Sequence, residues 1–176
     1  MIVLILGQIG TGKTFFNDVL VREFSRRHPE HDVIAVRPEG FARTMLPGRA
    51  RTFLYGPEAL DYLWAEHRVN FFASFSEVHE VAGRRAGAFD PRMHRLVFRG
   101  RHIGCNLICD SQRAAEVDPR LYSQASDTFS FRQELPLDLD RAEEYAIHPG
   151  ARDIIRALPD RAYYSFRSGA VHTLRV

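Results

Sequence analysis

Lys13 is the only lysine of the sequence, although lysine and arginine together occupy 24 positions. It stands in Gly7-Gln8-Ile9-Gly10-Thr11-Gly12-Lys13-Thr14, which fits the pattern G-x-x-x-x-G-K-[ST] of a phosphate-binding loop. Lysine can reach between phosphates as a flexible point charge, whereas the planar fork of arginine is a poor replacement. The Thr14 hydroxyl would take a place on Mg²⁺ and Lys13 would contact the β- and γ-phosphates of ATP. The expected nucleotide-binding residues are Gly7, Gln8, Ile9, Gly10, Thr11, Gly12, Lys13, Thr14 and Phe15.

A second polar run, Ser76-Glu77-Val78-His79-Glu80, follows a stretch of apolar residues. ATP hydrolysis needs one carboxylate that helps to hold Mg²⁺ and another that orients or deprotonates the attacking water. Glu77 is the predicted base and a candidate metal ligand; the alternative is a plain surface residue after a strand. Ser76 stands where aspartate is usual, and its hydroxyl can hold a Mg²⁺-bound water without offsetting the charge of the metal. His79 and Glu80 are interpreted as local hydrogen-bonding residues.

A third polar run, Asp110-Ser111-Gln112-Arg113, is expected at the end of another strand. A glutamine at this edge can contact the γ-phosphate or its attacking water and report hydrolysis, so Gln112 is predicted to be a sensor rather than an ordinary loop residue. The two cysteines, Cys105 and Cys109, lie on one face of the same strand and are too far apart for an easy disulfide. We interpret them as small buried residues in a reducing compartment; the alternative is a redox role.

The hydrophobic pattern shows the elements that must position these residues. Residues 2–6 are a continuous apolar run before the phosphate loop, and Phe16, Val19, Leu20 and Phe24 predict one apolar face on the helix after it. Further strands are expected at residues 32–36, 69–75, 106–110 and 128–131, helices at 57–67, 91–101, 139–145 and 151–158, a C-terminal β-hairpin at 161–166 and 170–175, and loops at 37–56 and 83–90. The alternation predicts an α/β fold with a mainly parallel central sheet sandwiched by helices, whose functional groups lie at the carboxyl ends of the strands.

The bulk properties are those of a globular chain. The 176 residues, 45% of them hydrophobic and 26% charged, suit a single domain over residues 1–176. No apolar run approaches the ~20 residues of a membrane-spanning helix, and we expect no signal peptide because the first strand leads straight into the phosphate loop. The formal net charge of +2 gives no global signature of polyanion binding. The preference for arginine over lysine suggests a GC-rich genome.

Together, the motifs resemble the FtsK–HerA superfamily of DNA-pumping ATPases. The phosphate loop is followed by the run at residues 76–80, by Gly100-Arg101-His102-Ile103-Gly104 leading into a strand, and by the glutamine Gln112 at the end of that strand. Asp118-Pro119-Arg120 and the strand entry Ser126-Asp127-Thr128-Phe129 are also similar. The phosphate loop is highly specific for nucleotide binding, and the later motifs are moderately specific for the superfamily.

The resemblance covers residues 1–135 and implies a RecA-like (ASCE-type) P-loop NTPase. It implies a homo-oligomer, a hexameric ring that uses ATP to move double-stranded DNA through its pore. The small size resembles the genome-packaging ATPases of tailless, membrane-containing viruses. Such a protein would act in the cytoplasm of the host cell or at a packaging vertex of the virion, with a capsid or membrane vertex protein as partner. Ser76 departs from the usual aspartate of the superfamily.

The resemblance also gives the arginines two roles. ATP would lie between subunits, and an arginine finger from the neighbour would stabilise the charge of the transition state. The candidates are Arg95, Arg99, Arg101 and Arg132. Contacts to DNA phosphates are plausible for arginines on predicted loops, for which ordinary exposed charge is the alternative. These are Arg43, Arg49, Arg51, Arg84 and Arg85.

Two other functions fit parts of the sequence. A small-molecule P-loop kinase would have the same phosphate loop and could use Gly83-Arg84-Arg85-Ala86-Gly87 as an arginine-rich lid. Glu77 and a strand that ends in Ser111-Gln112 suit water activation better than acceptor binding. A slowly hydrolysing, nucleotide-dependent assembly or regulatory module is the other alternative, suggested by Ser76.

Overall fold

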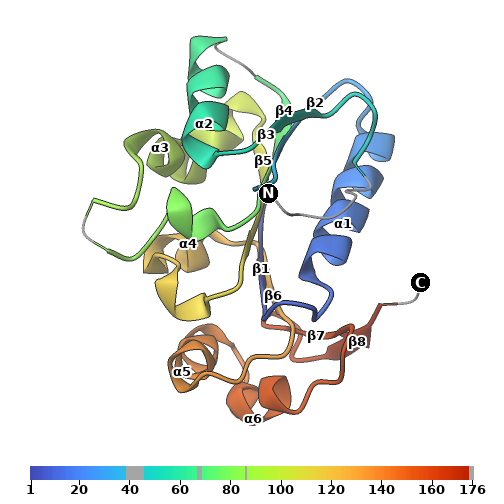
Figure 1. Cartoon of the computed structure of the whole chain (residues 1–176), viewed down its shortest axis with the longest axis vertical. Helices are drawn as coiled ribbons and strands as arrows, with labels where there is room; N and C mark the ends of the chain where they lie inside the picture. Colours follow the sequence, from blue (N-terminus) through green and yellow to red (C-terminus); the bar gives the residue numbers. More distant parts are fainter. Residues whose placement is uncertain (39–45, 67–68, 86, 175–176) are drawn as a thin grey trace.

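One twisted sheet organises the chain (Figure 1). The computed structural model describes residues 1–38, 46–66, 69–85 and 87–174, and in them the strands follow the order β3-β2-β4-β5-β1-β6-β7-β8. The strands are β1 (Ile2–Leu6), β2 (Asp32–Val36), β3 (Arg51–Phe53), β4 (Phe71–Phe75), β5 (Asn106–Ser111), β6 (Asp127–Ser130), β7 (Ala162–Ser165) and β8 (Val171–Thr173). The α-helices are α1 (Lys13–Arg27), α2 (Gly56–Ala65), α3 (Pro91–Arg99), α4 (Pro119–Gln124), α5 (Pro136–Tyr145) and α6 (Ala151–Arg156).

The sheet is parallel from β3 to β6, and only β7 and β8 run antiparallel. The structure therefore confirms the predicted α/β fold with a mainly parallel sheet and a C-terminal hairpin. In this order β5 lies between β1, which leads into the phosphate loop, and β4, which leads into Glu77. The carboxyl ends of three neighbouring strands thus bring together the three polar runs that the sequence singled out.

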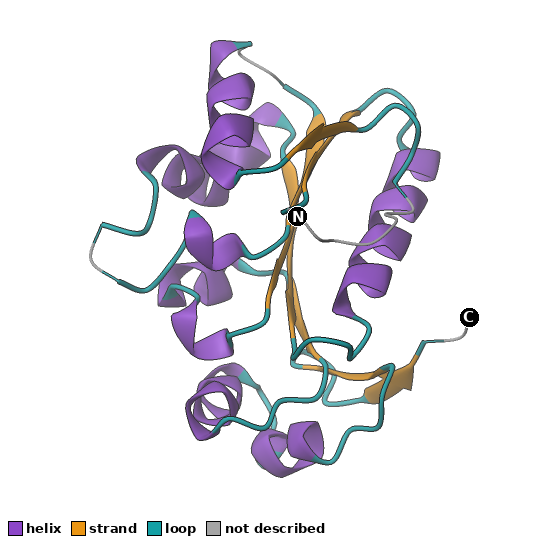
Figure 2. Ribbon diagram, viewed as in Figure 1, coloured by secondary structure: helices purple, strands orange, loops and turns teal. Residues whose placement is uncertain are grey.

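The two faces of the sheet are covered unequally (Figure 2). Helix α1 packs on one face, and α2, α3 and α4 pack on the other. Alternate residues of β1 follow this division, because Val3 and Ile5 join the core under α1 whereas Leu4 and Leu6 join the larger core on the other face. The central strands are fully buried, which explains why they read as continuous apolar runs.

The buried face of α1 differs from the prediction. Phe16 is buried, but Val19 is exposed, and Leu20 and Phe24 are only partly buried. The residues buried beside Phe16 include Asn17 and Asp18, whose polar side chains face the carboxyl ends of the strands. The prediction is confirmed for Phe16, Leu20 and Phe24, which join the hydrophobic core on this side of the sheet, and is wrong for Val19. The apolar pattern did not show that the same face also carries a buried polar network.

Several boundaries also differ from the sequence prediction. The expected loop 37–56 contains the short strand β3, which has too few residues for a periodic signal. Helix α4 was not predicted, although Asp118 caps its N-terminus and Pro119 occupies its first position. Helix α3 ends at Arg99, and a 3₁₀ helix over Gly100–Ile103 continues to β5.

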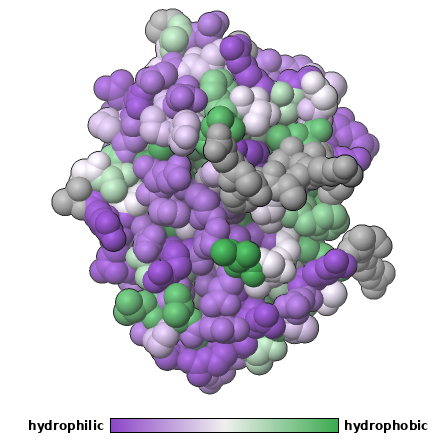
Figure 3. All heavy atoms as spheres, viewed as in Figure 1, coloured by the Kyte–Doolittle hydropathy of each residue, from purple (hydrophilic) through white to green (hydrophobic). Residues whose placement is uncertain are grey.

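The surface in Figure 3 is mostly hydrophilic, with apolar side chains in separate spots. Such scattered exposure of the described residues is normal for a folded chain. Among the described helices, none has both the length and the apolar character needed to cross a membrane.

Candidate nucleotide site

Glycines shape the phosphate loop between β1 and α1. Gly7, Gly10 and Gly12 have φ angles of 148°, 80° and 108°, which L side chains rarely adopt. At Gly7 a Cβ atom would also lie 2.6 Å from the Cβ of Phe131, so this position excludes larger residues on two grounds. The loop can therefore curl closely over the end of the sheet only with the glycines that the motif provides.

Backbone hydrogen bonds fix this loop to three other parts of the chain. The amide of Gly7 donates to the carbonyl of Ser111, the last residue of β5 (3.3 Å), and the amide of Gln8 donates to the carbonyl of Arg132 after β6 (3.2 Å). The amide of Arg161, at the entry to β7, donates to the carbonyl of Thr11 (3.1 Å). These hydrogen bonds attach the loop to the sheet without a ligand, and such preorganisation lowers the conformational cost of binding.

The concave side of the loop presents donors to an anion. Within the described chain, the amides of Gly10, Gly12 and Lys13 have no hydrogen-bond partner. They lie at the N-terminus of α1, where the helix dipole favours negative charge. Lys13 itself is only 5% exposed, and the adjacent cavity has a volume of about 330 Å³. The cavity is lined by Gly10, Gly12, Lys13, Thr14, Phe15, Arg161 and Leu174. Ile9, by contrast, is 80% exposed at the tip of the loop.

The predicted base and the predicted sensor are in direct contact. The Gln112 side-chain amide donates to Glu77 Oε1 at 2.6 Å, and the Gln112 backbone amide lies 3.3 Å from Glu77 Oε2. Glu77 has a left-handed backbone conformation (φ 54°), which turns its side chain toward the end of β5. His79 Nδ1 lies 3.5 Å from Glu77 Oε2 and 3.3 Å from Ser111 Oγ. His79 therefore has the local hydrogen-bonding position expected for it.

Asp110 is a fully buried carboxylate beside this pair. It accepts hydrogen bonds from Asn17 Nδ2 (2.5 Å) and Ser76 Oγ (3.0 Å), and Glu77 N lies 3.4 Å from its Oδ1. Asn17 comes three residues after Thr14 on α1, so the same helix face carries the threonine of the loop and the amide that reaches Asp110. The site thus has a carboxylate on β5 as well as the expected one after β4.

A buried arginine completes this network. Arg37, at the end of β2, is 3% exposed and forms an ion pair of 2.9 Å with Asp18. Its guanidinium also donates to Ser74 Oγ (2.9 Å) and Ser76 Oγ (3.1 Å). Ser76 therefore accepts from Arg37 and donates to Asp110, and its hydroxyl is engaged on both sides.

The oxygen atoms at this edge of the sheet are suitable ligands for Mg²⁺. They are hydroxyl and carboxylate oxygens, which this hard cation prefers to nitrogen or sulfur. The residues that could hold the ion, directly or through its waters, are Thr14, Ser76, Glu77 and Asp110.

The four candidate arginine fingers have different surroundings. The Arg95 guanidinium lies over the ring of Trp64 at 5.7 Å, and Arg132 pairs with Asp160 of its own chain at 3.0 Å. Arg99 and Arg101 are exposed near the amino end of β5 and form no side-chain hydrogen bond or ion pair with other described residues. Because the phosphate loop lies at the opposite ends of the strands, Arg99 and Arg101 are remote from the site of their own chain and available to a neighbour.

The arginines considered for DNA contacts also differ in their surroundings. Arg49 donates to the carbonyls of Ser25 and His28 and so caps the end of α1, and Arg51 lies over the ring of Tyr62 at 4.0 Å. Arg84 and Arg85 are exposed and line a cavity of about 470 Å³ together with His79, Gly83, Ala88, Ala115 and Glu116. Arg43 lies outside the described residues, as does Ala86 of the segment considered as a kinase lid.

Sequence reasoning missed three residues of the site: Asp110, Arg37 and Arg161. Asp110 was within the quoted polar run but received no role, although a carboxylate at the end of a buried strand is a signal in itself. Arg37 directly follows the apolar strand β2, and it was assigned to the following loop. Arg161 lines the phosphate cavity from more than a hundred residues away, which no local pattern indicates.

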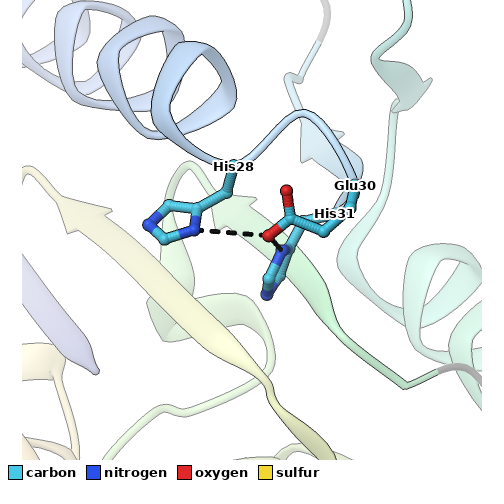
Figure 4. Close-up of side chains that lie close together, drawn as sticks. All are labelled: His28, Glu30 and His31. Carbon is cyan, nitrogen blue, oxygen red and sulfur yellow. Dashed lines mark hydrogen bonds and ion pairs between the residues drawn. The ribbon is translucent and has the colours of Figure 1, made fainter.

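The two cysteines and a histidine cluster have structural explanations. Cys105 and Cys109 are buried in the core, and burial raises the pKa of the Cys105 thiol to about 12 and that of Cys109 further. Both are thus inert thiols, as the sequence suggested. A cluster at the other end of α1 joins His28 and His31 to Glu30 Oε1, at 3.4 and 2.9 Å (Figure 4). The carboxylate satisfies both imidazoles, which closes the turn between α1 and β2.

Comparisons with known proteins identify structures with a similar fold. No family model and no curated protein match the sequence. The structure resembles the DNA-packaging ATPase B204 from Sulfolobus turreted icosahedral virus, with a TM-score of 0.77 and 17% identity over 99% of this chain and 98% of that one. For the genome packaging NTPase B204 from Sulfolobus turreted icosahedral virus 2, in complex with ATP-gammaS, the TM-score is 0.76 at 16% identity, covering 97% and 95% of the two chains.

A third similar structure is EccC (ATPases 2 and 3) from Thermomonospora curvata, with a TM-score of 0.66 and 15% identity over 99% of this chain but 37% of that one. At these identities the likeness shows the fold. The chain has the P-loop ATPase fold of these proteins, and the resemblance seen in the sequence is confirmed at the level of the fold.

Proposed function

We propose that this chain is an ATPase that translocates double-stranded DNA, and that it packages a viral genome into a preformed capsid as part of a hexameric ring. The observation that carries the proposal is the contact between Glu77 and Gln112 beside a preformed phosphate loop. A base and a sensor on neighbouring strands suit hydrolysis by water. The fold shared with the viral B204 proteins supports a role in packaging.

Each residue of the site has a distinct task in hydrolysis. The free amides of the loop and Lys13 bind the β- and γ-phosphates and hold them in line with the attacking water. Glu77 accepts the proton of that water or orients it, and Gln112, which already holds one oxygen of Glu77, contacts the γ-phosphate side. Thr14, Ser76, Glu77 and Asp110 would hold Mg²⁺, which would neutralise charge on the leaving group.

The ring supplies what one subunit lacks. Because Arg99 and Arg101 lie at the opposite end of the sheet from their own phosphate loop, either can complete the site of an adjacent subunit. Arg84 and Arg85 are the described loop arginines that remain free for phosphate contacts with DNA. Six copies that converge on a pore need only a few such charges each. Within the host cell, a capsid or membrane vertex protein would anchor the ring.

The test is an ATPase assay with and without double-stranded DNA, paired with a mass measurement of the assembly. We expect DNA to stimulate turnover and the active species to have the mass of a ring. DNA-independent transfer of phosphate from ATP to a small metabolite by a monomer would instead establish a kinase.

A slowly hydrolysing regulatory module is the second candidate, favoured by one observation. Ser76 is engaged by the Arg37 guanidinium at the position where a carboxylate usually supports the metal. If no carboxylate replaces it, turnover would be slow and nucleotide would act as a structural ligand. Whether the chain is a motor or a slowly hydrolysing module therefore depends on whether Asp110 can replace that carboxylate.

A further inference from the structure

We propose that Asp110 supplies the metal-supporting carboxylate that position 76 lacks, so that this function has moved one strand closer to the phosphate loop. The proposal rests on the function proposed above, since it concerns the Mg²⁺ that accompanies the nucleotide.

The register of the sheet places Asp110 at the same height along the strands as Ser76. Phe75 of β4 pairs with Cys109 of β5, so Ser76 and Asp110 follow at the same height on adjacent strands. On the other side, Ile5 of β1 pairs with Asp110. Neighbouring strands lie about 4.8 Å apart, so a carboxylate on β5 is nearer to the phosphate loop than one on β4 by about that distance.

The side chain of Asp110 lies on the face of the sheet that α1 covers. Asp110 contacts Asn17 of α1, and Ser76 contacts Asp110 directly, so all three side chains are on the α1 side of the sheet. The hydroxyl of Thr14 begins this same helix face one turn earlier. Thr14 and Asp110 therefore lie on the same side of the sheet, and both side chains could support one metal ion.

The balance of buried charge leaves Asp110 without a cation. Arg37 pairs with Asp18, whereas every hydrogen bond that Asp110 accepts from the described residues comes from a neutral donor: Asn17, Ser76 or the amide of Glu77. A carboxylate that is 0% exposed is expected to have a compensating charge. A divalent cation at the phosphate loop would provide it.

Arg37 explains why the carboxylate is not at position 76. Its guanidinium lies 3.1 Å from Ser76 Oγ, where an aspartate would form an ion pair with it in competition with the metal. On β5 the carboxylate is separated from Arg37 by the Ser76 hydroxyl and stays available to the metal side.

The experiment measures binding of a fluorescent ADP analogue to the full chain with Mg²⁺ and with EDTA, and the electron paramagnetic resonance spectrum of Mn²⁺ added with ADP. The variants are Asp110→Ser and the double variant Ser76→Asp, Asp110→Ser, which returns the carboxylate to β4. Asp61→Ser, which removes an exposed carboxylate of α2, is the control, and thermal unfolding verifies that each variant folds.

Mg²⁺ raises the affinity for the nucleotide, and we expect this increase to be about 10- to 100-fold smaller in Asp110→Ser. The affinity measured in EDTA should be unchanged. The double variant should regain part of the increase. The signal of bound Mn²⁺ should be strongest in the unmodified chain, weaker in the double variant and weakest in Asp110→Ser. Asp110→Ser with the full Mg²⁺ gain would overturn the proposal. If the unmodified chain binds no nucleotide even in EDTA, the nucleotide function itself is wrong, which is a separate result.

Discussion

At the scale of single residues, Glu77 is the group on which hydrolysis depends. Glu77→Gln keeps the shape and the hydrogen bond to Gln112 but removes the base, so we expect nucleotide affinity within about twofold of the unmodified chain and turnover lowered about 100-fold or more. The matched control is Glu80→Gln, three residues on, because Glu80 is exposed and makes no described side-chain contact. Equal turnover in the two variants would remove Glu77 from its assigned role.

Arg161 offers a second test at this scale. It has a left-handed backbone conformation (φ 64°) while its side chain lines the phosphate cavity. Arg161→Gly should therefore weaken nucleotide binding severalfold but keep or raise the free energy of unfolding, since relief of the backbone strain is worth about 1 kcal/mol. Comparing nucleotide titrations and denaturant unfolding for Arg161→Gly and Arg161→Ala separates the two effects. Unchanged affinity in both would mean that the arginine does not contact the nucleotide.

At the scale of elements, the helix caps carry a pH dependence. Asp118 caps α4 and pairs with Arg120, and this pairing holds the pKa of the Asp118 carboxyl below its usual range. A lowered folded pKa means that the stabilisation is complete above the unfolded pKa of about 4 and is lost as the pH falls through the folded value. Unfolding midpoints of the unmodified chain should thus decrease below about pH 4 more steeply than those of Asp118→Asn. Parallel curves would contradict this role.

The sequence predicted elements well where one local signal dominates. The apolar run of β1 and the octet after it sufficed for the strand, the loop and the start of α1. The sequence missed the polar part of the buried face of α1, because Asn17 and Asp18 are buried by partners on β4 and β5 and by Arg37 after β2, which lie far away in the sequence. The same cause hid Asp110: its neighbours are known only once β5 is placed between β1 and β4. The Glu77–Gln112 pair was predictable because strand ends converge in any parallel sheet.

At the scale of the whole molecule, shared active sites predict complementation between inactive chains. Lys13→Ala disables the phosphate loop, and the double variant Arg99→Ala, Arg101→Ala disables the proposed finger while leaving the loop intact. Each alone should lack turnover, but a one-to-one mixture should recover up to about a quarter of the activity, since a subunit with an intact loop then meets a neighbour with an intact arginine. A mixture of Lys13→Ala with Glu77→Gln, both defects of the same subunit's site, is the control and should stay inactive.

Recovery in the first mixture alone would establish that the arginines act between subunits. Equal recovery in both mixtures, or in neither despite ring formation, would exclude Arg99 and Arg101 as fingers and turn attention to Arg95, which rests on Trp64, and Arg132, which is paired within its own chain.

The hydrogen bond from the Arg161 amide to the Thr11 carbonyl has a consequence for how the protein is made. The phosphate loop is synthesised before Arg161 and Leu174, yet these two residues contribute one wall of its cavity. The strand before the loop likewise pairs with β5 and β6, which are synthesised about a hundred residues later. A nascent chain therefore cannot complete its nucleotide cavity until these late segments emerge.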